Sequence, residues 1–151
     1  MKYTTEIIVK VPRDEFIKKI LNYSNYKHWQ EGLENFEHIS GDPGTLGAKM
    51  KFNYKFGKRK MSLIETITYK NLPEEIHMNY DVKGMNNIQK NYFESTVDNY
   101  TKWVSKNQFV PTNFMMRMMI LIMPSTFKKQ SLKYLTDFKN FAENGKSVLN
   151  A

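Results

Sequence analysis

The sequence predicts an α+β domain in which a curved antiparallel sheet of about six or seven strands wraps around one long C-terminal helix. Two observations carry this prediction. Along most of the chain, apolar and polar residues alternate in short segments separated by glycine, proline and asparagine, as in strands joined by hairpins. Near the end the spacing becomes helical, with apolar residues at Phe127, Leu135, Phe138, Phe141 and Ala142. This helix is the one predicted element long enough to cover the apolar face of the sheet.

The beginning of the chain predicts one strand followed by two short helices. Residues 3–11 are rich in β-branched side chains and are expected to form the first strand. Pro12 suits the first turn of a helix, because that position needs no backbone N–H donor. We expect Ser24 or Asn25 to cap a second short helix, which carries Trp29.

The remaining strands are expected to follow one another as hairpins. They cover residues 36–40, 48–56, 60–69, 76–82, 88–97 and 100–110, with turns at 41–47, 57–58, 71–73, 84–87 and 98–99. The clearest alternation puts Met50, Phe52, Tyr54 and Phe56 on one face of their strand. One face of the next strand holds Met61, Leu63, Glu65, Ile67 and Tyr69. Each strand therefore turns one row of side chains toward the helix and the other toward solvent.

The last long segment, residues 114–144, is expected to divide at Pro124, because a proline inside a helix removes a backbone hydrogen bond. Residues 127–142 then form the covering helix. The segment 114–123, which has five methionines in its last nine residues, is a helix, a loop or a gate. Its methionines line an adaptable cavity, fill the core, or touch a membrane or a partner. Arg117 in this segment has to reach solvent, an acid or an anionic head group.

Composition excludes several functional classes. The 151 residues fit a single domain, 1–151, and hold no cysteine, so neither disulfides nor thiolate chemistry is available. No signal peptide is recognisable, and the longest apolar run falls short of the ~20 residues that a membrane span needs. A reducing cytoplasm is therefore the expected location. The three histidines lack metal-ligand spacing, and no glycine-rich phosphate loop or Ser-His-Asp set is present, so we expect no metal and no cofactor.

The net charge of +8 is concentrated in two segments. Residues 43–64 and residues 99–136 each carry six lysines and arginines and no acid. Because these lysines alternate with core residues, they fit the solvated faces of strands and of the helix. Contact with an anionic membrane is the alternative. Nucleic acid is not expected as a partner, since the aromatic residues that would stack on bases lie mostly on inward faces.

Several stretches together resemble the START/Bet v 1-like superfamily, also called SRPBCC or polyketide cyclase/dehydrase-like. They are Ile7–Pro12 leading into a helix with Phe16, then Tyr26–Trp29, Gly41–Gly47 before a strand, the Asp98-Asn99 turn followed by Thr101–Trp103, and the closing Phe127, Leu132, Leu135 and Phe138. The resemblance implies the helix-grip fold, with a cavity between sheet and helix that holds a hydrophobic small molecule or lipid. Members of this superfamily include carriers, sensors, chaperone-binding domains and a minority of enzymes, so the activity stays open.

Glu65 is the candidate residue with the most chemical content. It shares a predicted face with Leu63 and Ile67, and a carboxylate there is unfavourable to bury unless it is paired or hydrated. A pocket acid would orient a ligand or act as a general base with a raised pKa. If the neighbouring Ile64 points inward instead, Glu65 lies in solvent.

The other candidates would line the predicted cavity. Ser105 and Asn107 would offer hydrogen bonds to a ligand, unless their end of the strand lies in solvent. Each tyrosine combines an apolar body with one polar group, and it is either a pocket residue or plain core. The predicted lining is Phe52, Tyr54, Leu63, Glu65, Ile67, Met78, Tyr80, Tyr92, Trp103, Ser105, Met115, Met119, Phe127, Ser131 and Leu135.

The sequence therefore favours a binding module, a carrier or sensor, for a hydrophobic or amphipathic small molecule or lipid. The first alternative is a small polyketide cyclase/dehydrase-like enzyme with Glu65 as base beside a pocket tyrosine. The second is an interaction module whose basic surface contacts an anionic membrane. The sequence leaves the identity of the ligand and the oligomeric state open.

Overall fold

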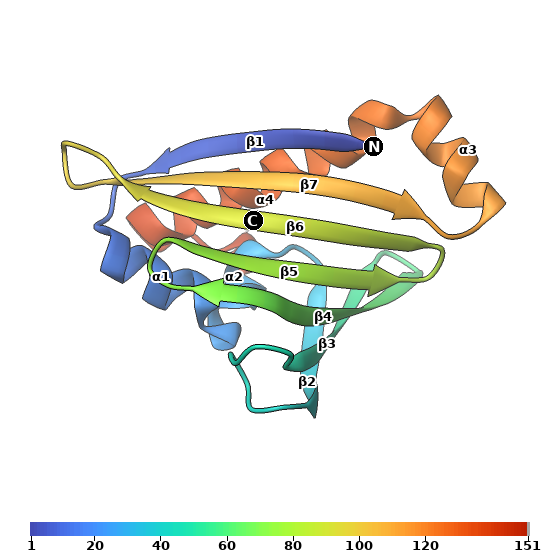
Figure 1. The fold of residues 1–151 in the computed structure, drawn as a ribbon, viewed down its shortest axis with the longest axis horizontal. Coiled ribbons are helices and arrows are strands. Elements are labelled where there is room, and N and C mark those ends of the chain that lie inside the picture. The colour runs from blue at the N-terminus through green and yellow to red at the C-terminus, as the bar shows by residue number, and fades with distance from the viewer. Residues whose placement is uncertain (151) are drawn as a thin grey trace.

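Seven antiparallel strands form one sheet in the part of the chain that the computed structural model describes, residues 1–150 (Figure 1). The strands are β1 (Lys2–Val9), β2 (Leu33–Ser40), β3 (Lys49–Phe56), β4 (Arg59–Asn71), β5 (Glu75–Val82), β6 (Met85–Ser95) and β7 (Thr101–Pro111). Their order across the sheet is β1-β7-β6-β5-β4-β3-β2. Each strand from β2 to β6 therefore pairs with its successor, and β1 closes the series beside β7.

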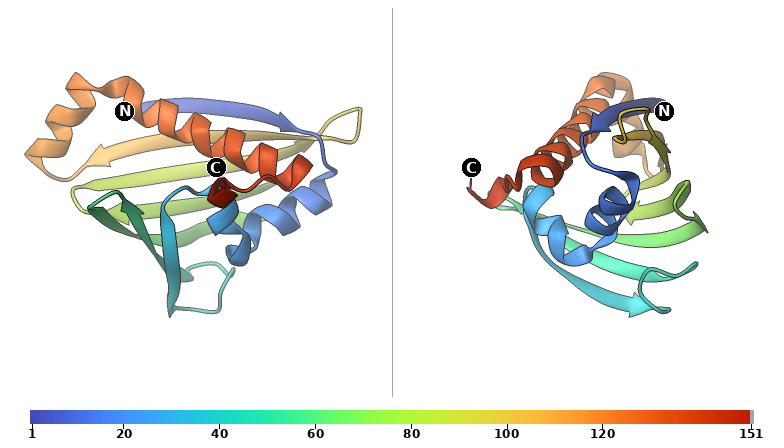
Figure 2. Two further views of the ribbon diagram at one scale, coloured as in Figure 1. Left: turned by 180° about the vertical axis from the view of Figure 1, so that it is seen from behind. Right: turned by 90° about the vertical axis from the view of Figure 1, so that its left-hand side faces the viewer.

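The helices gather on the concave side of the sheet, which is called the inner face below. They are α1 (Arg13–Leu21), the 3-10 helix η1 (Tyr23–Asn25), α2 (Tyr26–Trp29), α3 (Phe114–Ile122), α4 (Pro124–Asn144) and the 3-10 helix η2 (Val148–Asn150). Figure 2 shows α4 crossing this side of the curved sheet, with α1 and α2 beside it and α3 at the far end. The predicted helix-grip architecture is confirmed.

The core is an aromatic cluster where α1 and α4 meet the inner face. Phe138 of α4 is fully buried, and its ring centroid lies 5.0 Å from that of Phe16, 5.2 Å from Trp29 and 5.7 Å from Trp103. All three pairs are edge-to-face, a geometry that aromatic quadrupoles favour. Phe93 of β6 completes the cluster, 5.2 Å from Phe16. One side chain of α4 thus contacts α1, α2 and β7.

Local sequence determines both ends of α4. Met123 has φ −128° and ψ 55°, which ends α3, and Pro124 takes the first position of α4, where its missing N–H is not needed. At the other end Gly145 adopts a φ of 66°, which glycine reaches without Cβ strain, and its N–H donates to the Phe141 carbonyl at 2.8 Å. The predicted division at Pro124 is confirmed, and the segment before it is a helix.

The predicted cap of the second helix is confirmed in position but not in hydrogen bonding. Asn25 occupies the N-cap position of α2, but its side chain makes no capping hydrogen bond to the described residues. Asn22 instead caps η1, because its side chain accepts a hydrogen bond from the Ser24 N–H at 3.0 Å. The chain therefore enters α2 through a 3-10 turn that carries Tyr23.

Two expectations about strands and turns also need correction. β4 has a bulge between Ile67 and Tyr69, so Tyr69 leaves the inner face and is 44% exposed. The turn expected at residues 84–87 ends earlier, because Asn87 already pairs with β5 as part of β6.

Replacing Phe138 by alanine tests whether this cluster stabilises the fold. We expect Phe138→Ala to lower the free energy of unfolding by about 3–5 kcal/mol, because the ring leaves a cavity among aromatic neighbours. Urea unfolding followed by circular dichroism measures the change. Leu132→Ala is the matched control on the same helix, since Leu132 is 41% exposed and its truncation should cost less than about 1 kcal/mol. Equal losses in the two variants would contradict this assignment of the core.

Candidate functional site

A buried carboxylate lies on the inner face. Glu65 projects from β4 between Met50 of β3 and Tyr80 of β5, with which it is in register, and it is 1% exposed. Among residues 1–150, it is the only charged residue in the buried set. The structure thus places Glu65 on the inner face and Ile64 on the outer one.

The Glu65 carboxylate has one hydrogen-bonded oxygen and one without a partner. The Tyr23 hydroxyl donates to Oε1 at 2.9 Å, whereas the nearby Tyr80 hydroxyl donates to Met78 Sδ at 3.0 Å. The buried Oε2 accepts no hydrogen bond from the described residues. Burial disfavours the charged form and raises the pKa of Glu65 to about 7, while the nearby hydroxyls of Tyr23 and Tyr80 act in the opposite direction. At neutral pH the carboxyl therefore exists in both its protonated and its ionised form.

Tyrosines surround this carboxyl. Burial raises the pKa of each of the phenols at Tyr23, Tyr26, Tyr54 and Tyr80, and the negative charge of Glu65 raises it further. The four phenols consequently keep their protons near neutral pH. Glu65 is then the one group of this cluster that exchanges a proton near neutrality.

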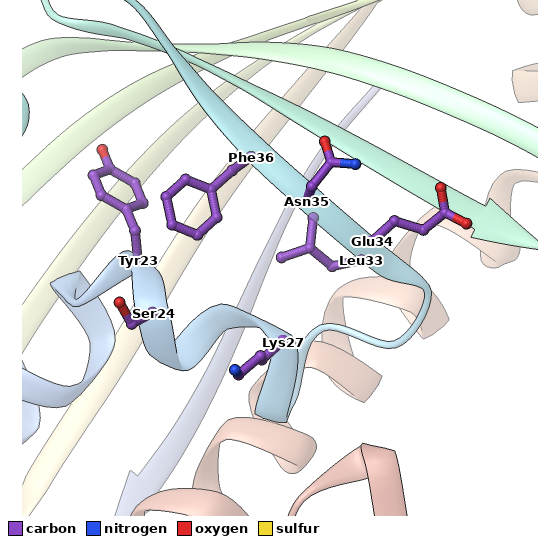
Figure 3. Close-up of a pocket in the computed structure, with 7 residues that line it drawn as sticks. All are labelled: Tyr23, Ser24, Lys27, Leu33, Glu34, Asn35 and Phe36. Atoms are coloured by element: carbon purple, nitrogen blue, oxygen red, sulfur yellow. The ribbon is translucent and has the colours of Figure 1, made fainter.

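A surface hollow of about 300 Å³ adjoins the cluster. Its lining consists of Tyr23, Ser24, Lys27, Leu33, Glu34, Asn35 and Phe36 (Figure 3). The ring of Tyr23 lies 5.8 Å from that of Phe36 inside this lining, while its hydroxyl bonds to Glu65. The Tyr23 side chain therefore joins the hollow to the buried carboxyl.

A second set of polar side chains lies on the inner face, on β6 and β7. The Asn87 and Gln89 side chains donate to Asn107 Oδ1 at 3.3 and 3.1 Å, and Asn107 Nδ2 donates to Ser105 Oγ at 3.2 Å. Asn91 Nδ2 donates to Gln89 Oε1 at 3.1 Å. These five residues are called the amide ladder below. An apolar face could fill the same positions with aliphatic side chains, so the ladder is a feature that packing alone does not require.

The amide ladder and Glu65 are contiguous across the sheet. Strand register puts Glu65 opposite Tyr80, and Tyr80 opposite Asn87 of the ladder. Asn87 Oδ1 is buried without a hydrogen-bond partner among the described residues, and so is Thr5 Oγ1 on β1. Unpartnered acceptors therefore occur at intervals from β4 to β1, which suits a ligand with several polar groups.

The prediction that Tyr92 lines the inner face is wrong. Tyr92 lies on the outer face, where its ring is 5.6 Å from that of His77 and 5.3 Å from Lys106 Nζ. Its neighbour Phe93 faces inward, because Phe93 pairs with Trp103 and directly paired residues share a face.

The length of the β6–β7 loop explains this error and the omission of Asn87, Gln89 and Asn91 from the predicted site. A two-residue turn at Asp98-Asn99 would pair position 92 with Ser105 and bring Tyr92 inside. In the structure Ser95 pairs with Thr101, so five residues form the loop and the register moves by one position. The signal in the sequence was Phe93 itself. If this large apolar residue is assigned to the inner face together with Trp103, then Asn91, Gln89 and Asn87 fall on the same face, because they alternate with it along β6.

The other predicted lining residues divide by location. The inner face or its cover holds Phe52, Tyr54, Leu63, Ile67, Met78, Tyr80, Trp103, Ser105 and Leu135. Phe127 and Ser131 belong to the part of α4 nearest α3, where the Phe127 ring is 5.0 Å from Phe109 and Ser131 Oγ is 2.6 Å from the Tyr3 hydroxyl. Met119 is half-buried. Met115 is 74% exposed, because α3 turns this side to solvent, so its prediction as a lining residue is wrong.

Comparison with known proteins reveals similarity of structure. No protein-family model matches the chain, and no curated protein matches its sequence. Solved structures align over nearly the whole chain. Ara h 8.0201 aligns with a TM-score of 0.72 at 10% identity, over 94% of this chain and 97% of its own. The major latex-like protein 151 of Panax ginseng aligns with a TM-score of 0.71 at 11% identity, over 94% and 97%.

This chain has the Bet v 1-like helix-grip fold. A third protein with the same arrangement is DynU16, from the dynemicin biosynthetic locus, with a TM-score of 0.71 at 13% identity. The alignment covers 97% of this chain but 48% of DynU16. The resemblance expected from the sequence is thus confirmed for the fold. Identities this low establish the fold alone, so the function has to be argued from the residues of the inner face.

The raised pKa of Glu65 predicts a specific dependence of stability on pH. Between pH 4.5, the ordinary pKa of this group, and about 7, the folded state holds a proton that the unfolded chain releases. The contribution of Glu65 to stability therefore falls as the pH rises through this window, by about 3 kcal/mol in total. Glu65→Gln removes this titration, so the variant should gain about that much relative to the parent across the window.

Urea unfolding of parent and variant at a series of pH values measures this difference, in which the titrations of other groups cancel. Glu94→Gln, an exposed carboxyl on β6, is the control and should show no comparable trend. A constant difference between the Glu65→Gln variant and the parent would contradict the raised pKa.

Proposed function

We propose that the inner face binds an amphipathic small molecule, with an apolar skeleton and several hydroxyl, carbonyl or amide groups. The observation that carries the proposal is the 1% exposed Glu65, whose Oε2 has no hydrogen-bond partner among the described residues and which is contiguous with the amide ladder. A ligand donor would satisfy this oxygen. We expect the ligand to carry several polar groups, because buried polar atoms without partners among the described residues extend from Glu65 on β4 to Thr5 on β1.

The energetics of burial support a role in binding. A carboxyl without full hydrogen bonding lowers the stability of a folded protein, and an aliphatic residue at position 65 would not. Asn87 Oδ1 and Thr5 Oγ1, which have no hydrogen-bond partner among the described residues, add similar penalties. Polar groups without partners on one continuous face can form hydrogen bonds with a ligand and so fix its orientation.

Differences in burial along the inner face indicate where a ligand gains access. At the end formed by α1, the core residues Phe16, Phe93 and Phe138 are at most 2% exposed. At the end near α3, inner-face residues such as Leu63 and Phe109 are only half-buried. The side chains at this second end are the ones that a ligand displaces with least loss of packing.

The predicted cavity between sheet and α4 stays a prediction. The hollow beside Tyr23 lies against β2, and a second hollow, of about 390 Å³, is lined mainly by outer-face residues of β1, β6 and β7. Ligand binding on the inner face therefore requires side-chain movement, for which the flexible Met61 and Met78 are suited. The Bet v 1-like fold commonly accommodates small molecules or lipids, which supports a site of this kind.

A pair of matched ligands tests the proposal. Titration of the labelled protein with 2-naphthol and with naphthalene, followed by ¹H–¹⁵N spectra, reports binding of the same skeleton with and without a hydroxyl. We expect both to shift amides of β4 to β7, with the naphthol binding more tightly. Glu65→Leu, which keeps a side chain of similar size, should weaken naphthol binding by about tenfold and leave naphthalene unchanged.

Glu94→Gln is the control for this titration and should bind as the parent does. Native mass spectrometry of the purified protein adds an independent measurement, because a co-purified ligand would appear as added mass. Absence of added mass, together with no shift on the inner face for either ligand, would overturn the proposal.

The protonation of Glu65 favours a second candidate function, proton transfer in a cyclisation or dehydration of a polyketide-like substrate. A carboxyl with a pKa of about 7 suits general acid–base catalysis at neutral pH, and the Tyr23 hydroxyl, which donates to Oε1 at 2.9 Å, would hold the carboxylate in position. In that case Glu65→Gln should lower turnover of a polyketide-like substrate panel by about 10²–10⁴-fold while binding persists. Equal turnover by variant and parent would exclude Glu65 as the base.

A further inference from the structure

Helix α3 carries its apolar side chains toward solvent. Five of its apolar residues are exposed, namely Phe114 (77%), Met115 (74%), Met118 (38%), Leu121 (75%) and Ile122 (70%). At 3.6 residues per turn these positions form one continuous arc, roughly a third of the circumference of the helix. The half-buried residues Met116, Met119 and Ile120 occupy the opposite side, and α3 contacts β7 and α4. The exposed arc is called the α3 apolar face below.

Such a face is unusual for a helix at the surface of a protein in water. Surface helices turn their apolar stripe to the core and their polar stripe outward, whereas both sides of α3 are apolar. Asn113 nevertheless caps the helix, because its side chain accepts a hydrogen bond from the Met116 N–H at 2.9 Å. The α3 apolar face therefore belongs to a well-formed helix and requires a covering surface.

Charge indicates what covers it. Arg117 lies beside Leu121 at the edge of the α3 apolar face, and Lys128 and Lys129 follow in the first turns of α4. All three are exposed and form no ion pair with the described residues. Residues 99–136 contain no acid. An exposed apolar surface with one arginine at its edge and two lysines soon after it in the chain, all without ion pairs among the described residues, complements the lipid chains and phosphate groups of an anionic bilayer.

A second copy of this chain fits the same surface less well. In a symmetric dimer through α3, Arg117 and the neighbouring lysines of one copy would approach the same cations of the other. No carboxylate in this segment would offset that repulsion. A bilayer with anionic lipid supplies the opposite charge instead.

We propose that α3 docks the protein on an anionic lipid bilayer, with the α3 apolar face inserted among the lipid chains and Arg117, Lys128 and Lys129 at the phosphate groups. The helix of nine residues is roughly 13 Å long, so it lies along the interface and does not cross it. No helix of residues 1–150 is long and apolar enough to span a membrane. Docking in this way would bring the half-buried end of the inner face close to the lipids, although it does not depend on ligand binding there.

Vesicle flotation tests the proposal with the full chain. Vesicles of phosphatidylcholine alone are compared with vesicles that also contain phosphatidylglycerol, at low and at high salt. We expect binding to the mixed vesicles at low salt, and clearly weaker binding at high salt or without the anionic lipid. Leu121→Ser should reduce the bound fraction at limiting lipid by about tenfold, because serine loses the buried hydrocarbon of leucine.

Matched variants distinguish binding through the α3 apolar face from nonspecific binding through other exposed residues. Leu46→Ser, at a residue that is 66% exposed in the turn before β3, should bind as the parent does. The double variant Lys128→Gln with Lys129→Gln should weaken binding by about an order of magnitude, whereas Lys58→Gln with Lys60→Gln at the β3–β4 turn should not. All four are exposed lysines, so no loss of folding is expected.

Three results would overturn the proposal. The first is absence of binding to either kind of vesicle at low salt. The second is equal loss from the Leu46 and Leu121 variants, or a loss confined to the Lys58 and Lys60 pair. The third is sedimentation of the parent as a dimer that Leu121→Ser converts to a monomer, which would assign the α3 apolar face to self-association. Ligand titration of the inner face is unaffected by any of these outcomes, so the two proposals fail separately.

Discussion

The contact of Phe138 with the inner face is the interaction on which the rest of this structure depends. A helix of 21 residues cannot stay on a sheet through its own hydrogen bonds, and it needs side chains that the sheet and the other helices can bury. Phe138 meets Phe16, Trp29 and Trp103 at edge-to-face distances of 5.0 to 5.7 Å, which joins α4 to α1, α2 and β7. Because this packing lies at one end of α4, the other end is free to cover a different kind of surface.

That division accounts for the polar part of the inner face. Glu65 and Asn87 lie outside the aromatic cluster. Each has a buried oxygen without a hydrogen-bond partner among the described residues, which lowers the stability that the cluster supplies. The same division places α3, with its exposed apolar residues, next to the less densely packed end (Figures 1 and 2). The position of Phe138 on α4 thus has two consequences. The end of the inner face near Phe138 is densely packed, and the end near α3 holds polar or exposed residues.

Local rules predicted the elements well and the register poorly. The alternation around Met50 and Glu65 identified the inner faces of β3 and β4, because a strand reverses side-chain direction at every residue. The hairpin of β6 and β7 needed one more fact, the length of its loop. Five loop residues in place of two moved the pairing by one position, which put Tyr92 outside and Asn91 inside. The bulge after Ile67 had the same kind of effect on Tyr69.

The sequence by itself determined the order of elements and the break at Pro124, because each follows from residues close together in the chain. Only the tertiary structure decided that Glu65 points inward, that its Oε2 has no hydrogen-bond partner among residues 1–150, that the amide ladder lies beside it and that Met115 faces solvent. These facts depend on which distant strands and helices come into contact, and that is decided by the packing of the whole fold. The segment from Phe114 to Asn144 shows both: its division is local, but the exposure of α3 is a property of the assembled domain.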